Sequence, residues 1–187
     1  MDAYIEKFIE ILNKVTIYNK SNIAFPDYAT GMRTIIRKFC EVREHRRCVF
    51  FIGNGGSAAI ASHMTIDFMK NGRMRTCSLA DSSVLTCMGN DYGYEDIYSK
   101  QLEYLGETGD VLVAISSSGN SENICRAVKT AQNKGMEVVA FSGFDPNNKL
   151  LTTGDYKVYV PVDKYGFVES IHNLMLQQIV DELAEKE

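Results

Sequence analysis

Two short segments of this chain combine glycine with hydroxyl-bearing residues in a way that suits anion binding. The first is Gly53-Asn54-Gly55-Gly56-Ser57, and the second is Ser116-Ser117-Ser118-Gly119-Asn120-Ser121. Glycines let the backbone approach a ligand closely, while serine hydroxyls and the amides at a helix N-terminus donate hydrogen bonds to phosphate oxygens. Taken alone, the serine segment would be interpreted as a helix cap with spare serines. The presence of both segments predicts a phosphate-binding site.

Each segment follows a short apolar run and precedes a helical pattern. Residues 48–52 (CVFFI) and 110–115 (DVLVAI) are apolar at nearly every position, which is typical of strands buried on both faces of a parallel sheet. Residues 58–70 and 122–134 then have the pattern of helices. Ligands of such sheets bind beyond the carboxyl ends of the strands, so we expect the two segments to lie side by side.

The remaining sequence continues this alternation of strands and helices, which predicts an α/β fold with a doubly wound parallel sheet. Further expected elements are strands at 76–79, 136–141 and 156–160, helices at 98–105 and 168–183, a helix start at 81–83, and a loop at 89–96. With 187 residues, 45% of them hydrophobic, the chain fits one domain spanning 1–187.

Two helices are expected before the first buried strand, within residues 1–45. The first, at 2–19, is amphipathic, and a second follows Pro26 with a stripe of apolar residues from Tyr28 to Val42. Apolar side chains occur on more than one side of the first helix, which predicts that this helical pair contacts a second subunit and that the protein is a homo-oligomer.

Composition excludes several classes of partner. A net charge of −4 without a long basic run argues against a nucleic-acid surface, and no apolar run reaches transmembrane length. The N-terminus is too polar for a signal peptide. The five cysteines are scattered without a CxxC pair, which favours free, buried thiols in a reducing cytoplasm: Cys40, Cys48, Cys77, Cys87 and Cys125. A cytoplasmic protein with no membrane partner is expected.

Nucleotide binding is the main alternative use of the glycine segment. Gly53, Gly55 and Ala58 fit the loose dinucleotide fingerprint GxGxxA, and Asp81 follows the next strand at a plausible distance for a ribose contact. The fingerprint leaves the serine segment unexplained, and no lysine follows as in the nucleotide triphosphate motif GxxxxGK. We therefore expect no nucleotide cofactor.

The two segments, in this order and spacing, resemble the signature loops of SIS (sugar isomerase) domains, and most closely those of phosphoheptose isomerases. The resemblance extends over nearly the whole chain, including Met88-Gly89-Asn90-Asp91-Tyr92-Gly93 and the closing helix. It implies an SIS-type sheet, a tetramer with sites shared between subunits, and conversion of sedoheptulose 7-phosphate to a heptose 7-phosphate.

The resemblance also assigns residues to the substrate. Those implied to bind the phosphate, together with the nearby Ser57, are Ser116, Ser117, Ser118 and Ser121. Those implied to line the sugar are Asn54, Gly55, Gly56, Asn90 and Asp91. From the residues alone, Asp91 is equally well explained as a turn residue before Gly93.

His63 and Asp67 lie four residues apart, so they share one face of the expected helix. Such a pair could bind a metal or hold a carboxylate base beside an imidazole, although spacing alone favours a surface ion pair. The family's zinc sites use a His and a Glu here, so Asp67 is one methylene shorter. Glu169 stands where the family has Gln, and Gln177 where it has a His that transfers protons.

A divalent metal, zinc in the family, is therefore expected on His63, Asp67, Glu169 and Gln177, with Gln177 as a carbonyl donor. Asp67 is the first choice for the catalytic base and Glu169 the second. His172, three residues after Glu169, could replace the missing acid, but the family also has a His at this place beside its catalytic set, which favours a packing or hydrogen-bonding role. His45, in a charged segment, is expected at the surface.

The leading hypothesis is aldose–ketose isomerisation through an enediol, in which a base removes the proton next to the carbonyl. The substitutions at Asp67, Glu169 and Gln177 favour an alternative, a non-catalytic phosphosugar-binding or adaptor protein with the same fold.

Overall fold

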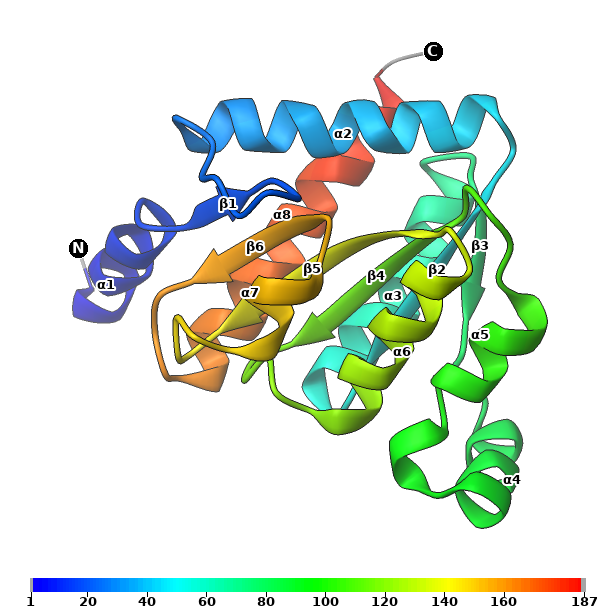
Figure 1. Ribbon diagram of the computed structural model, residues 1–187. Helices are drawn as coiled ribbons and strands as arrows, with labels where there is room; N and C mark the ends of the chain where they lie inside the picture. The colour runs from blue at the N-terminus through cyan, green and yellow to red at the C-terminus, as the bar shows by residue number, and fades with distance from the viewer. Residues whose placement is uncertain (1, 186–187) are drawn as a thin grey trace.

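The computed structural model describes residues 2–185, and a six-stranded sheet in the order β1-β6-β5-β4-β2-β3 lies at its centre (Figure 1). The strands are β1 (Thr16–Tyr18), β2 (Cys48–Gly53), β3 (Arg75–Ser78), β4 (Val111–Ser116), β5 (Glu137–Gly143) and β6 (Tyr156–Val160). Strands β2 to β6 are parallel, and β1 pairs antiparallel with β6. The predicted α/β fold is confirmed, with one antiparallel edge strand added.

Helices cover both faces of this sheet (Figure 1). They are α1 (Ala3–Leu12), α2 (Tyr28–Glu44), α3 (Gly56–Lys70), α4 (Ser82–Tyr92), α5 (Ser99–Leu105), α6 (Glu122–Asn133), α7 (Lys149–Thr153) and α8 (Tyr165–Ala184), with a 3-10 turn η1 (Tyr94–Asp96). Helices α2, α3 and α8 pack on one face, and α5, α6 and α7 pack on the other.

The central strand β4 explains why its sequence is apolar at every position. Val111, Val113 and Ile115 point into the core beneath α2, α3 and α8, whereas Leu112 and Ala114 point into the core beneath α5 and α6. All five side chains are buried. A strand covered on both faces has no solvent side, so the usual alternation of polar and apolar residues disappears.

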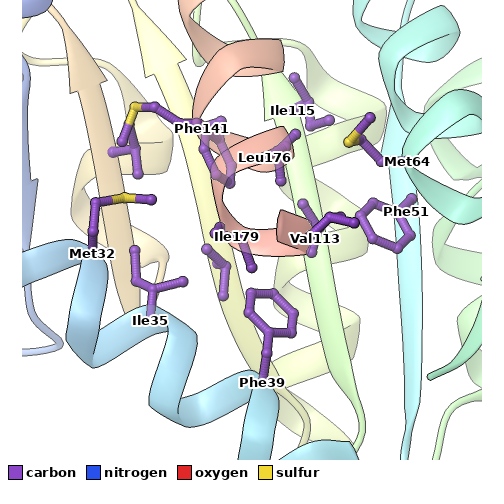
Figure 2. Packing of buried hydrophobic residues seen from close by; sticks show 14 of the residues in the cluster. Met32, Ile35, Phe39, Phe51, Met64, Val113, Ile115, Phe141, Leu176 and Ile179 are labelled. Carbon is purple, nitrogen blue, oxygen red and sulfur yellow. The ribbon is translucent and has the colours of Figure 1, made fainter. Parts of the chain in front are cut away.

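The larger core joins α2 and α8 to the sheet (Figure 2). Phe39 projects from α2 into this core, and its ring contacts Phe68 of α3 at a centroid distance of 5.1 Å. Phe68 in turn contacts Phe51 of β2 at the same distance. This packing fixes α2 and α3 against the strand that carries the glycine segment.

The predicted first helix at 2–19 is wrong in its second half. Helix α1 ends at Leu12, and Thr16–Tyr18 forms β1 beside β6. The β-branched Thr16 and Ile17 suit a strand. Ile17 is buried against Gly31 of α2, where an added Cβ would lie 2.8 Å from the Ile17 Cβ. The strand thus depends on a small residue elsewhere in the chain.

Two further predictions about local structure are wrong. The expected loop at 89–96 is the last part of α4 followed by η1, and the short helix α7 was not expected. Each of the five cysteines is a free thiol as predicted, but Cys87 is exposed and the other four are half-buried. Within residues 2–185, no helix combines the length and apolar character needed to cross a membrane.

Candidate functional site

The glycine segment connects β2 directly to α3. Gly53 ends the strand, and an added Cβ there would lie 2.5 Å from the backbone of Ser57, so the first turn of α3 packs on the strand end. Gly55 has φ +53, a conformation that favours glycine. An added Cβ at Gly56 would lie 2.5 Å from the carboxylate oxygens of Glu169. This compact turn places the N-terminus of α3 at the carboxyl end of β2, facing the space beyond the strand ends.

The serine segment connects β4 to α6 in a similar way. Ser116 ends the strand, and its hydroxyl lies 3.3 Å from that of Ser121. Gly119 has φ +64 and packs directly against the buried amide of Asn148, leaving no room for a side chain. The Leu150 amide donates to the Gly119 carbonyl at 3.1 Å. The unpredicted α7 therefore supports the serine loop from behind.

The two loops meet as predicted, because β2 and β4 are neighbours with Gly53 in register with Ile115. Between them is a cavity of about 240 Å³. Its lining residues are Asn54, Gly55, Gly56, Ser57, Ser116, Ser117, Ser118, Ser121, Tyr165 and Glu169. The N-termini of α3 and α6 both adjoin it, and helix N-termini favour anions.

Ser117 lines this cavity, and its hydroxyl is buried in the cavity wall without a partner within residues 2–185. The residue is 5% exposed, and its hydroxyl is a buried side-chain atom without a hydrogen-bond partner among the described residues. Buried hydroxyls are normally paired, because an unpaired one costs about 1–3 kcal/mol. If the Ser117 side chain rotated toward the cavity, acceptor oxygens of a ligand there would supply the missing partner.

The structure does not bring Asn90 and Asp91 to this cavity. Both are exposed at the end of α4, where the Asn90 amide donates to Asp91 at 2.9 Å. The Cys87 thiol lies 3.6 Å from the other Asp91 oxygen, and the charge of Asp91 raises the pKa of that thiol. Within this chain the two residues lie at a helix end that projects from the domain (Figure 1), and their place in a sugar site shared between subunits stays a prediction.

The predicted metal ligands divide into two groups. His63 Nε2 lies 3.1 Å from Asp67 Oδ2, and the Gln177 amide donates to the same oxygen at 2.8 Å. Glu169 instead contacts Gly56 at the cavity. Within residues 2–185, no three His, Cys, Asp or Glu side chains are grouped so as to hold a metal. The four predicted ligands therefore do not form one metal site within this chain.

His172 lies in the core. It is 0% exposed, its Nε2 lies 3.2 Å from the Ser142 carbonyl oxygen, and its ring contacts Phe141 edge-on at 5.5 Å. Burial lowers the pKa of His172 to about 4. Because the ring is outside the cavity lining and neutral near pH 7, its surroundings favour the packing or hydrogen-bonding role over that of a catalytic acid.

Two contributors to the site were missed from the sequence. Tyr165 lines the cavity at the start of α8, one helical turn before Glu169. Asn123, in the first turn of α6, forms two hydrogen bonds with Asn54. The position of Asn123 two residues after Ser121 was a usable signal, whereas nothing near Tyr165 in the sequence indicated its place.

The sequence model of the SIS domain family matches residues 3–143. The chain belongs to the SIS domain family. The phosphoheptose isomerase of Clostridium acetobutylicum is 35% identical over 190 residues, covering 97% of this chain and 95% of that protein. The phosphoheptose isomerase of Bordetella avium is 41% identical over 137 residues, which cover 69% of this chain and 70% of that protein.

Solved structures extend this SIS relationship to the whole fold. A phosphoheptose isomerase from Neisseria gonorrhoeae superposes with a TM-score of 0.84 at 30% identity, covering 98% of this chain and 96% of that one. Another phosphoheptose isomerase, from Francisella tularensis, superposes with a TM-score of 0.84 at 28% identity, covering 99% of this chain and 96% of that one. The predicted SIS resemblance is confirmed in both sequence and architecture.

Proposed function

We propose that this protein is a phosphosugar isomerase that interconverts sedoheptulose 7-phosphate and a heptose 7-phosphate. Its similarity to phosphoheptose isomerases over 97% of the chain supports an aldose–ketose isomerase. The observation that carries the phosphate assignment is the cavity between two strand-to-helix turns, which is lined by serines and adjoined by two helix N-termini, with no cationic side chain in its described lining. Phosphate oxygens would accept from the serines and from helix amides, without a cationic side chain in the described lining.

In this proposal the base is a carboxylate. Glu169 lines the same cavity as the serines, whereas Asp67 lies eleven residues along α3 from Gly56, about 16 Å at 1.5 Å per residue. We therefore place Glu169 ahead of Asp67, reversing the order expected from the sequence. Glu169 takes a proton from carbon 1 of the ketose to form the enediol, the hydroxyl proton moves between the two oxygens, and the carboxyl returns a proton to carbon 2.

Exchange with solvent tests this assignment. Sedoheptulose 7-phosphate incubated with the protein in heavy water should acquire deuterium at carbon 2 of the aldose product. Glu169→Gln should abolish this exchange while leaving sugar-phosphate binding intact. Asp67→Asn is the matched variant: if it abolishes exchange and E169Q does not, the base is Asp67. Binding without any exchange by the natural chain would instead support the non-catalytic alternative.

A metal remains a separate proposal that this mechanism does not use. Zinc on His63, Asp67, Glu169 and Gln177 is implied by the family, but within the described residues Glu169 is apart from the other three. Elemental analysis of the purified protein and of His63→Ala tests it. Zinc present at one ion per chain, and lost in H63A, would support a site completed in some other arrangement.

We also propose that the protein is a cytoplasmic homotetramer. Helix α1 exposes apolar side chains that its own domain does not cover: Tyr4 at 55%, Ile5 at 48% and Ile9 at 42%. Five free thiols are consistent with a reducing compartment. Light scattering would measure the assembly directly, and Ile5→Glu with Ile9→Glu should lower the molar mass if α1 is an interface.

A further inference from the structure

We propose that Asn123 is a positioning residue that holds the Asn54 side chain so that it offers an N–H, and not its carbonyl oxygen, to the sugar. Asn54 is half-buried in the glycine loop, and Asn123 is 2% exposed in the first turn of α6. The Asn54 amide donates to Asn123 Oδ1 at 2.9 Å, and the Asn123 amide donates to Asn54 Oδ1 at 2.9 Å. This pair ties the glycine loop to the serine loop. The inference rests on the proposed sugar-phosphate substrate.

The orientation of the pair is determined by a backbone group. The Ile124 N–H donates to Asn123 Oδ1 at 3.0 Å, and a backbone N–H can only donate. The oxygen of Asn123 must therefore occupy that position, which leaves its NH₂ facing Asn54. The atom of Asn54 that meets this NH₂ must in turn be its oxygen. The amide orientation of Asn54 is thus set by the start of α6.

Asn54 has one side-chain N–H left for a ligand. Its Oδ1 accepts from the Asn123 amide and from the Tyr94 hydroxyl at 3.2 Å, which uses both lone pairs. Its Nδ2 carries two hydrogens, and one is donated to Asn123. The other is unused among the described residues. Asn54 lines the 240 Å³ phosphate cavity and also two adjoining cavities, of about 430 and 490 Å³.

This arrangement would select for an acceptor oxygen on the sugar. An amide that rotated freely could offer either end, but reversing Asn54 would place its NH₂ against the NH₂ of Asn123. A second contact holds the backbone beneath it, because the buried Tyr98 hydroxyl donates to the Gly53 carbonyl at 2.5 Å. The donor of Asn54 is therefore fixed in both position and orientation before the substrate arrives.

A double-mutant cycle tests the inference. We would measure kcat/KM for sedoheptulose 7-phosphate and the affinities for this sugar and for inorganic phosphate, using Asn54→Ala, Asn123→Ala and the double variant. If Asn123 acts through Asn54, each single variant should lose roughly tenfold in kcat/KM, and the double variant should lose no more than N54A. The affinity for inorganic phosphate should remain within about twofold, because the serines are untouched.

Asn123→Asp is the second variant, since it keeps an acceptor for the Ile124 N–H and guards against misfolding of N123A. It places an oxygen against Asn54 Oδ1 and should reproduce the loss with sugar-phosphate while keeping phosphate affinity. Multiplicative losses in the double variant, or equal losses of phosphate and sugar-phosphate affinity, would overturn the positioning role. If the natural chain neither converts the sugar-phosphate nor binds it more tightly than phosphate, the proposed function itself fails, and this inference fails with it.

Discussion

The free energy of unfolding should fall at acidic pH because of one buried side chain, His172. Its ring is 0% exposed, and burial lowers its pKa to about 4, with the Ser142 carbonyl opposing part of that shift. In the unfolded chain the pKa returns to about 6.5. As the pH falls, the unfolded state therefore binds the proton first. The contribution of neutral His172 to the free energy of unfolding is fully present above about pH 6.5. It is lost progressively as the pH falls toward 4.

The size of the effect follows from the two pKa values. The unfolded and folded pKa values differ by about 2.5, which corresponds to roughly 3 kcal/mol of unfolding free energy. Roughly 2 kcal/mol of this should be lost when the pH falls to 5. Single domains have unfolding free energies of about 5–15 kcal/mol, so this loss is large enough to measure by urea denaturation.

The assay compares unfolding free energies at pH 8 and pH 5 for the natural chain and for His172→Gln. Glutamine does not titrate, yet it keeps an N–H for the Ser142 carbonyl, which His172 contacts at 3.2 Å. Between pH 8 and pH 5, the unfolding free energy of H172Q should fall by roughly 2 kcal/mol less than that of the natural chain. His45→Gln is the matched control at an exposed position and should behave as the natural chain does. Equal losses in H172Q and the natural chain would refute the reasoning, and a folded H172Q without turnover would restore His172 as the acid.

Three glycine and core substitutions give further tests. Gly119→Ala should destabilise the serine loop by roughly 1–3 kcal/mol and abolish phosphate binding by calorimetry, because the position has φ +64 and lies against Asn148; unchanged phosphate affinity would contradict this. Gly56→Ala should preserve the melting temperature but reduce kcat by displacing the Glu169 carboxylate, and undiminished turnover would remove Glu169 from the mechanism. Phe39→Ala should cost roughly 3–5 kcal/mol in urea unfolding with phosphate affinity retained, since Phe39 belongs to the core in Figure 2 and does not line the phosphate cavity.

The sequence by itself determined the parallel sheet and the position of the phosphate loops. Residues 48–52 and 111–115 must be buried on both faces because no position in them is polar, and two such strands with helical connections form a parallel sheet. The carboxyl ends of neighbouring parallel strands point the same way. The glycine and serine loops therefore had to meet, and the structure places Gly53 in register with Ile115.

Local sequence was insufficient where a segment depends on a distant one. Thr16–Tyr18 continues an amphipathic pattern and becomes a strand only because β6 offers an edge and Gly31 leaves space for Ile17. The sequence pattern predicted neither α7 nor a role for Asn148, because Asn148 packs against Gly119, which lies on a different loop. Helix spacing placed His63 beside Asp67, whereas only the family resemblance indicated that Gln177 of α8 would lie with them.

The chemistry of the site was decided by tertiary structure for the same reason. His172 and Glu169 are three residues apart on α8, yet one points into the core and the other reaches the cavity. The hydrogen-bonding end of Asn54 is set by Asn123 and by the Ile124 N–H, on a helix far along the chain. Residue type fixes which atoms are available, whereas burial and hydrogen-bond partners, which arise only when distant segments pack, fix their protonation and orientation.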